Sequence, residues 1–394
     1  MPVHVYLVPG MFGFAKIGSL DYFGHMTVAI EARYASRGRR AVCHVVDVHP
    51  SASIRRRADS LLRRMLDTAG EESTPVHILG HSTGGLDARL LASPTSRILR
   101  DESLRPKAEA LLERLASITT VNTPHRGTPL AAFFATKSGQ QVLYALMALT
   151  VTGLKLGAPP LALASTLLAT LGRISGAIEL SVIERVSESL IKVLDDASSR
   201  DLRSFLKQIR ADQGTVIQLT PEAMDIFEAS VIDRAGVRYQ SVASFAPEGG
   251  QKNSLGTLLS PWSLVSGAIF TVLYNLTAAE DERYPCNSSD PRMVRSVSTM
   301  LGQVPPASAN DGVVPFHSQL WGELLWAGRA DHLDIVGHFP GARRSRKQDP
   351  NVDWLRSGSG FDETRFETVM DRVVDGMFLA EETQSVPDLK LPGA

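Results

Sequence analysis

A serine flanked by glycines follows a short apolar run in the first quarter of the chain. Residues 76–79 predict a buried strand, Gly80-His81-Ser82-Thr83-Gly84 a sharp turn, and the apolar pattern from Leu86 onward a helix. The glycines allow close backbone packing around a strained turn. The helix N-terminus directs unpaired N–H groups toward an anion forming near Ser82. This context favours a nucleophile for acyl transfer over an ordinary serine in a glycine-rich turn.

A nucleophilic serine needs a base, a group that orients the base and donors for an oxyanion. Two later segments carry suitable side chains, Asn310-Asp311-Gly312 and Asp331-His332-Leu333-Asp334. The glycine-rich loop that follows the strand expected at residues 3–8 is a position for a backbone oxyanion donor. Among the other histidines, His81 faces the wrong way in a tight turn to act as the base. His125 is a weaker candidate to border the site because it lies on a loop leaving a strand, and a role in loop structure is the alternative.

The elements that must position these residues alternate along the chain. We expect strands at 3–8, 41–48, 76–79, 116–122, 216–219 and 237–245, and helices at 52–69, 104–115 and 362–380. Alternating strands and helices predict a mostly parallel sheet with helices on both faces. The arginines of the 52–69 helix are expected to lie largely on its solvated face: Arg55, Arg56, Arg57, Arg63 and Arg64.

Two insertions interrupt this pattern. Residues 131–209 show helical periodicity with no charge between 156 and 172, and a second apolar segment covers 262–276. A membrane span is the alternative, but Pro159-Pro160 leaves a stretch shorter than the roughly 20 residues that a span requires. We therefore expect a large helical cap or lid over an apolar cleft. The predicted core comprises 1–130, 212–250 and 305–380, the insertions 131–211 and 251–304, and a mobile tail 381–394.

Composition narrows the partners. Lys+Arg number 41 and Asp+Glu 42 in 394 residues, so the chain is close to neutral and a nucleic-acid partner is disfavoured. Two cysteines make no disulfide framework, and we expect Cys43 and Cys286 to be free thiols. No signal peptide is visible in the sequence as given, which predicts a cytoplasmic protein, or a secreted one if a leader was removed. The oligomeric state does not follow from the sequence.

Six motifs resemble, in order, bacterial triacylglycerol lipases of the Pseudomonas and Burkholderia type, members of the α/β-hydrolase superfamily. They are Val8-Pro9-Gly10-Met11-Phe12-Gly13-Phe14, Asp21-Tyr22-Phe23, the segment 80–85, Asn122-Thr123-Pro124-His125-Arg126-Gly127, Asn310-Asp311-Gly312-Val313-Val314 and His332-Leu333-Asp334. The resemblance covers roughly 3–130, 215–245 and 308–338. It implies an α/β-hydrolase fold and a serine hydrolase of esters with apolar acyl chains, acting at a lipid interface.

The resemblance also implies roles for individual residues. Ser82 would be the nucleophile, Asp311 the triad acid and His332 the base, with the backbone N–H groups of Met11 and Thr83 as oxyanion donors. Asp334, the rival acid, corresponds to a calcium ligand of the family. His338 stands where the family has a glutamine, and calcium prefers oxygen ligands, so we expect no cofactor. An acyltransferase or polyester depolymerase with the same triad, or a non-catalytic membrane-interaction module, are the alternatives.

Overall fold

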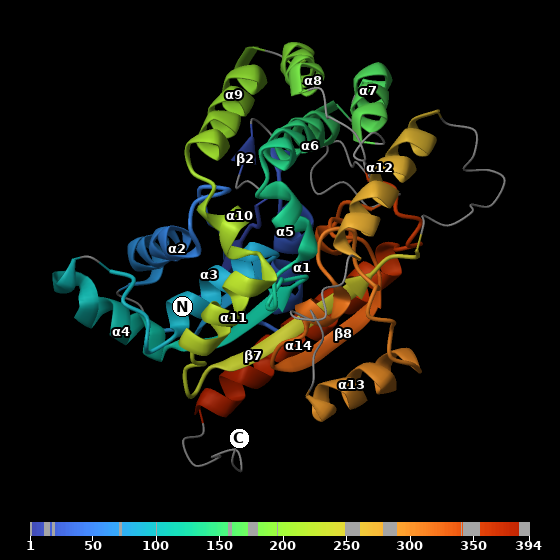
Figure 1. The fold of residues 1–394 in the computed structure, drawn as a ribbon. Helices are drawn as coiled ribbons and strands as arrows, with labels where there is room; N and C mark the ends of the chain where they lie inside the picture. Colours follow the sequence, from blue (N-terminus) through green and yellow to red (C-terminus); the bar gives the residue numbers. More distant parts are fainter. Residues whose placement is uncertain are drawn as a thin grey trace.

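The computed structural model describes residues 2–11, 16–17, 20–70, 73–99, 101–156, 160–171, 180–194, 196–248, 261–278, 290–339, 341 and 355–385. A six-stranded sheet lies at its centre in the order β4-β1-β5-β6-β7-β8, with every neighbouring pair parallel (Figure 1). The strands are β1 (Val3–Val8), β4 (Ala41–Val45), β5 (Val76–His81), β6 (Leu115–Val121), β7 (Arg238–Phe245) and β8 (Glu323–Arg329). A separate hairpin joins β2 (Lys16–Ile17) to β3 (Leu20–Asp21).

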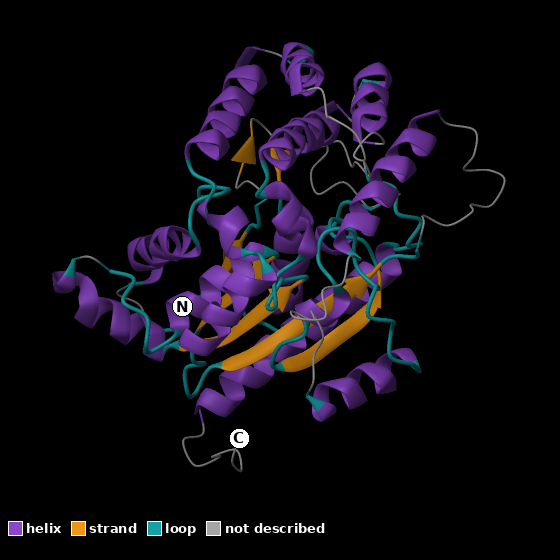
Figure 2. Cartoon of the chain, viewed as in Figure 1, coloured by secondary structure: helices purple, strands orange, loops and turns teal. Residues whose placement is uncertain are grey.

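Helices cover both faces of the sheet (Figure 2). On one face lie α1 (Gly24–Ser36) and α14 (Glu363–Ser385), and on the other α2 (Ile54–Ala69), α3 (Thr83–Ala92) and α4 (Arg105–Glu113). Alternate residues of β7 reach the two layers, because successive side chains of a strand point to opposite faces. Gln240 donates to the Gly376 carbonyl of α14, whereas Tyr239 packs with α2, α3 and α4. The central strands β1, β5 and β6 are buried along their whole length, as a sheet covered on both faces requires.

The remaining helices lie in the chain between β6 and β7 and between β7 and β8. They are α5 (Pro129–Phe134), α6 (Lys137–Leu156), α7 (Leu161–Leu171), α8 (Leu180–Lys192), α9 (Asp196–Ala211), α10 (Gly214–Gln218), α11 (Pro221–Ser230), α12 (Pro261–Thr277) and α13 (Pro291–Leu301). Short 3₁₀ turns cover Glu102–Leu104, Phe316–Gln319 and Asp334–Val336. In Figure 1, α6, α7, α8 and α9 gather at one end of the molecule, far from α4 and α13. Within the described part of the chain, none of the helices combines the length and apolarity needed to cross a membrane.

Most expected elements are present, and the helical character expected for 131–209 holds for its described residues. The strand expected at 216–219 is wrong, because Gly214–Gln218 forms helix α10. A four-residue apolar run does not distinguish a strand from a helical turn by its pattern, and here Val216 is buried while Ile217 is 61% exposed. The edge strand β8 was not predicted from the sequence.

The C-terminal helix also departs from expectation. It was predicted to end near residue 380, with a tail from 381, but α14 continues to Ser385. Glu381 is buried in this last part, where it accepts hydrogen bonds from Tyr34 and His77 and pairs with Arg39. The helix is therefore bonded to β5 and α1 beyond the expected boundary, and residues 386–394 lie outside the described residues.

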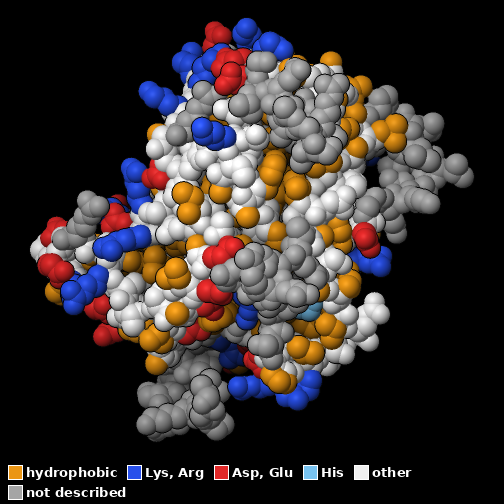
Figure 3. Space-filling view, in the orientation of Figure 1, with side chains coloured by type: hydrophobic (Ala, Val, Ile, Leu, Met, Phe, Trp, Pro, Cys, Tyr) orange, Lys and Arg blue, Asp and Glu red, His pale blue; other side chains and the backbone are white. Residues whose placement is uncertain are grey.

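The surface charges and the thiol of Cys43 agree with what the composition predicts. The face drawn in Figure 3 carries charged side chains of both signs, Lys, Arg, Asp and Glu, with apolar side chains between them. Cys43 is a free thiol, as predicted, and burial raises its pKa. Cys286 lies outside the described residues.

Candidate active site

Ser82 lies at a sharp turn between β5 and α3, as the strand–turn–helix pattern predicts. Its backbone adopts φ 54° and ψ −129°, and it shares a positive φ with one other described non-glycine residue, Asn122. A non-glycine residue in this region is strained and persists only where the surroundings hold it. The Ser82 N–H donates to the Val121 carbonyl at 2.8 Å. The fold thus presents this serine at the carboxyl end of the central strand, at the N-terminus of a helix.

Two glycines allow the segments around Ser82 to approach closely. A Cβ atom at Gly10 would lie 2.5 Å from Ser82 Cβ, so the loop after β1 packs directly against the serine. A Cβ atom at Gly84 would lie 2.1 Å from the Val8 carbonyl oxygen. Both distances are too short for any side chain larger than hydrogen. Glycine at these positions therefore lets β1, its loop and α3 converge on Ser82.

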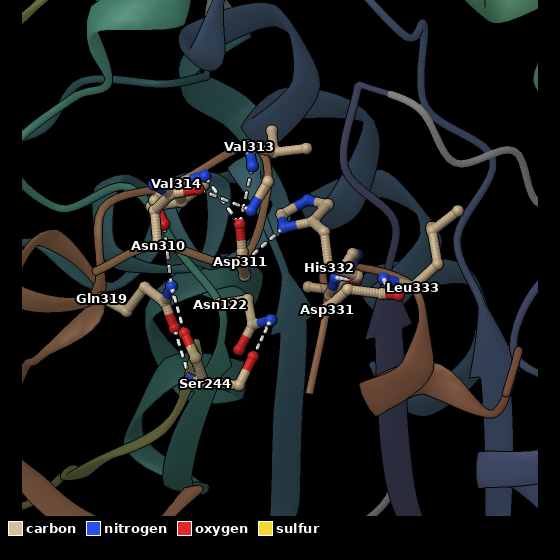
Figure 4. A network of polar contacts seen from close by, with 12 residues as sticks. Asn122, Ser244, Asn310, Asp311, Val313, Val314, Gln319, Asp331, His332 and Leu333 are labelled. Carbon is tan, nitrogen blue, oxygen red and sulfur yellow. Dashed lines mark hydrogen bonds and ion pairs between the residues drawn. The ribbon is translucent and has the colours of Figure 1, made fainter. Parts of the chain in front are cut away.

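Asp311 and His332 form a buried, hydrogen-bonded pair (Figure 4). His332 Nδ1 lies 2.7 Å from Asp311 Oδ2, and the other carboxylate oxygen accepts the N–H groups of Val313 at 2.9 Å and Val314 at 2.7 Å. A carboxylate only accepts, so Nδ1 carries the proton and Nε2 keeps its lone pair. Among the described residues, Nε2 has no hydrogen-bond partner. The ring is therefore oriented and protonated as a general base requires.

A polar network holds the loop that carries Asp311. Gln319 donates to the carbonyls of Ser244 and Val314 at 3.0 Å, and its amide oxygen accepts the Ser244 N–H at 2.7 Å. Asn122 donates to the Ser244 hydroxyl at 2.8 Å, which joins the strained residue after β6 to the same network (Figure 4). These side chains are fully buried, so each bond fixes the loop in a region with little competing water. Sequence patterns gave no signal for Gln319 or Ser244.

His81 links the turn that carries Ser82 to the loop that carries His332. Its Nε2–H donates to the His332 carbonyl at 2.9 Å, so Nδ1 accepts from the Tyr22 hydroxyl, also at 2.9 Å. The His81 and His332 rings lie 4.6 Å apart. Burial lowers the pKa of His81 well below its ordinary value, so this ring stays neutral. With both nitrogens occupied, His81 does not serve as the base, in agreement with the sequence argument.

Ser82 and His332 belong to neighbouring loops, but their side chains do not form a hydrogen bond in this structure, since His332 Nε2 has no partner. Ser82 is only 5% exposed. Catalytic hydrogen bonds are often long or absent without substrate and tighten in the complex. The structure therefore brings Asp311 and His332 together and leaves the contact between Ser82 and His332 to be completed.

Arg57 is a site residue that sequence reasoning placed wrongly, because it is fully buried and not on a solvated face. Its guanidinium donates to the Pro9 carbonyl of the loop after β1, and its Nε lies 2.9 Å from Asp87 Oδ2 on α3. Further bonds reach the carbonyls of His49 and Pro50. The position of Arg57 in the helical pattern did not indicate burial, because its partner Asp87 lies thirty residues away in the sequence. Arg57 thus ties the expected oxyanion loop to the helix that follows Ser82.

Met11 and Thr83, the expected oxyanion donors, are both buried beside Ser82. Within the described residues, neither backbone N–H has a backbone acceptor. Both residues line a small, largely apolar pocket with Ser82: Met11, Ser82, Thr83, Pro124, Thr128, Leu130, Ala131, Phe134, Val216, Leu219, Val313 and Val314. A second apolar pocket adjoins His332 and is lined by Leu146, Thr150, Leu273, Val313, His332, Leu333 and Leu355. Ser82 and His332 therefore each border an apolar pocket, and Val313 lines both pockets.

Asp334 holds the loop that carries His332. Its Oδ2 accepts the Asp331 N–H at 3.0 Å and the Ser359 hydroxyl at 2.6 Å. Asp331, which the sequence did not single out for a role, accepts the Ser357 hydroxyl at 2.7 Å and the N–H groups of Leu333 and Asp334 at 2.9 Å. All four side chains are buried. Each side of the His332 loop is thus bonded to the segment that carries the two serines.

These residues do not fit the calcium site that the resemblance implies. Asp334 Oδ2 already accepts two protein hydrogen bonds, and His338 supplies a nitrogen where a hard cation prefers oxygen. Burial also lowers the pKa of His338 to about 4, which fits a ring buried among apolar and aromatic neighbours. Among the described residues, no group of three or more His, Cys, Asp or Glu side chains is arranged to hold a metal.

His125 is a structural residue outside both pockets. Arg89 donates to its Nδ1 at 3.0 Å, its Nε2–H donates to the Thr120 hydroxyl at 3.1 Å, and its ring stacks on Trp321 at 5.4 Å. Burial lowers its pKa well below the ordinary value. Both ring nitrogens are occupied, so His125 supports the loop after β6.

No protein-family model matches the chain. Curated triacylglycerol lipases do match it. One from Pseudarthrobacter phenanthrenivorans is 25% identical over 360 residues, which cover 88% of this chain and 92% of that protein. One from Burkholderia plantarii is 25% identical over 360 residues, which cover 88% of this chain and 82% of that protein. A third, from Pseudomonas fragi, is 30% identical over 148 residues, covering 36% and 43%.

Solved structures that match the chain include the lipase of Staphylococcus hyicus, with 14% identity, a TM-score of 0.47 and 97% of each chain covered. Another is lipase 1 from Pelosinus fermentans, with 17% identity, a TM-score of 0.46, and 90% of this chain and 97% of that chain covered. The order of the parallel strands and the strand–turn–helix unit at Ser82 identify the fold as that of an α/β-hydrolase. The sequence matches confirm the resemblance drawn from the motifs: this chain is similar to curated bacterial triacylglycerol lipases over 88% of its length.

Proposed function

We propose that this chain is a serine hydrolase of carboxylic esters with apolar acyl chains, with Ser82, His332 and Asp311 as its catalytic triad. One observation carries the proposal: His332 is held by Asp311 with its Nε2 lone pair free of any described partner, next to the loop that presents Ser82 on a strained turn. The apolar pockets at Ser82 and His332 support an apolar substrate. The triacylglycerol lipases among its relatives support an ester or lipid substrate.

The chemistry follows from these atoms. Ser82 Oγ attacks the ester carbonyl carbon while its proton passes to His332 Nε2, and the carbonyl electrons move onto oxygen. The N–H groups of Met11 and Thr83 stabilise that oxyanion, and Asp311 stabilises the imidazolium. When the C–O bond breaks, His332 returns the proton to the departing alcohol and leaves an acyl-enzyme. Water then repeats the sequence, releasing the acid and Ser82.

The helical insertions 131–211 and 251–304 serve in this proposal as a cap over a core made of 1–130, 212–250 and 305–380. Three residues of α6 and α12, namely Leu146, Thr150 and Leu273, line the same pocket as His332. Phe270 of α12 packs against Gly312, beside the triad acid, so closely that a Cβ atom there would lie 2.6 Å from the ring. Since Ser82 is almost fully buried, substrate entry requires these helices to move, which exposes apolar surface suited to a lipid interface.

The test is hydrolysis of a series of esters below and above their solubility limits. We expect turnover to rise with acyl length and to increase when aggregates form. Preference for acetyl esters without any response to aggregates would contradict the lipid-directed reading. Adding alcohol acceptors separates hydrolysis from acyl transfer: free acid as the main product supports the proposal, and a transferred ester as the main product overturns it.

A further inference from the structure

Thr83 carries a hydroxyl with no visible role in the fold. The residue is fully buried, and its Oγ1 has no hydrogen-bond partner among the described residues. A buried hydroxyl without a partner destabilises the folded protein, so such a group calls for an explanation. Thr83 also lines the pocket that contains Ser82. The orphan hydroxyl is therefore at the reacting centre.

The position of Thr83 directs its side chain toward the site of reaction. It is the first residue of α3, and the Cα–Cβ bond of a helical residue leans toward the helix N-terminus. The oxyanion is expected at that end of α3. Elsewhere in this chain, Thr150, Ser187 and Thr271 donate their hydroxyls to the carbonyl four residues earlier. As the first residue of α3, Thr83 has no such carbonyl within its own helix, and its hydroxyl has no partner among the described residues.

The other hydroxyl-bearing neighbour in the pocket is already used. Besides Ser82 and Thr83, the one polar side chain among the residues that line this pocket is Thr128, and its hydroxyl donates to the Val313 carbonyl at 2.7 Å. The pocket is otherwise apolar. A new acceptor that appears beside Ser82 would therefore meet the Thr83 hydroxyl as its available side-chain donor.

We propose that Thr83 is a catalytic residue through its side chain, donating a third hydrogen bond to the oxyanion beside the N–H groups of Met11 and Thr83. This rests on the proposed function. The ester carbonyl oxygen becomes negatively charged when Ser82 Oγ bonds to its carbon, and a donor fixed in an apolar pocket strengthens as that charge develops. The unpaired hydroxyl of the resting state gains its partner in the transition state, so its contribution raises kcat more than it lowers KM.

The experiment compares Thr83→Val, which removes the hydroxyl at similar volume, with Thr83→Ser, which keeps it. Thr27→Val is the matched control, because Thr27 also has a buried hydroxyl without a described partner but lies on α1, outside both pockets. Kinetics use a short-chain p-nitrophenyl ester, and binding uses an alkyl boronic acid that adds to the serine. Circular dichroism confirms that each variant is folded.

We expect Thr83→Val to lower kcat by about 10- to 100-fold and boronic acid affinity by a similar factor, with KM little changed. Thr83→Ser should stay within about threefold of the parent, and Thr27→Val should match it. The inference is overturned if Thr83→Val keeps kcat within about twofold, or if Thr83→Ser loses as much as Thr83→Val. A parent protein with no esterase activity would instead remove the proposed function itself.

Discussion

Replacing Asp311 with asparagine should change which nitrogen of His332 carries the proton. The carboxylate uses one oxygen to accept the N–H groups of Val313 and Val314 and the other to accept His332 Nδ1–H. An asparagine keeps the two backbone bonds if its carbonyl oxygen takes the place of the carboxylate oxygen that accepts from Val313 and Val314. Its NH₂ group then faces Nδ1 as a donor, so the ring moves its proton to Nε2 and can no longer accept the proton of Ser82.

The size of the effect follows from the cost of the alternative. A competent tautomer needs the amide reversed, which places the NH₂ group against two backbone donors and leaves both unpaired. Each lost buried hydrogen bond costs about 1–3 kcal/mol, so the reversal costs about 2–6 kcal/mol. At about 1.4 kcal/mol per decade, turnover should fall between about 30-fold and about 10⁴-fold. Loss of the charge that stabilises the imidazolium favours the upper end of this range.

Asp334→Asn is the matched control, another buried carboxylate exchanged for an amide in the same region. It weakens the bonds to Asp331 and Ser359 and should cost about 1–3 kcal/mol of stability, with less than about a tenfold loss of turnover. Both variants are assayed with a soluble p-nitrophenyl ester at equal folded fraction. If Asp334→Asn proves the more damaging, or Asp311→Asn stays within tenfold of the parent, the assignment of the triad acid is wrong.

Three further outcomes follow from the structure. Arg57→Met should lower the unfolding free energy by about 3–5 kcal/mol because it leaves the carboxylate of Asp87 buried and unpaired. The side chain of Arg56 is 66% exposed, so the control Arg56→Met should lower it by less than about 1 kcal/mol. Equal losses for the two variants in urea unfolding would contradict the buried pair. Chelation with EDTA should leave turnover and the thermal midpoint unchanged, and recovery of lost activity by added calcium would show that a cation site exists. Stability should fall as the pH drops below about 6.5, by up to about 1.4 kcal/mol per pH unit for each histidine, because burial lowers the folded-state pKa of four rings and the unfolded chain takes up protons first. Unchanged urea midpoints at about pH 7 and about pH 5 would refute this for His77, His81, His125 and His338.

The parts of the site that sequence alone could predict are those set by local signals. The run around Ser82 specifies strand, turn and helix within a few residues, and the structure has that geometry. The order of Asp311 and His332 along the chain made their pairing a prediction, and they are hydrogen-bonded. The short apolar segment around Val216 was misread, because four residues fit either a strand or a helical turn.

The rest depends on contacts between distant residues. Arg57 turns inward because it bonds to Asp87 and to the Pro9 carbonyl. The spacing of residues in the 52–69 helix does not indicate a partner on another element. Ser359 bonds to Asp334 across 25 positions of the sequence. A hydroxyl without a partner, such as that of Thr83, is visible only when every neighbouring donor and acceptor has been placed. Such features require the folded structure.

Labelling with a fluorophosphonate tests the central claim most directly, because the reagent bonds to a serine only when a base and an oxyanion site activate it. The protein should be labelled stoichiometrically, peptide mapping should place the adduct on Ser82, and Ser82→Ala should abolish both labelling and esterase turnover while the protein remains folded. Labelling at another residue, or near-normal turnover by purified Ser82→Ala, would contradict the assignment of Ser82 as the nucleophile.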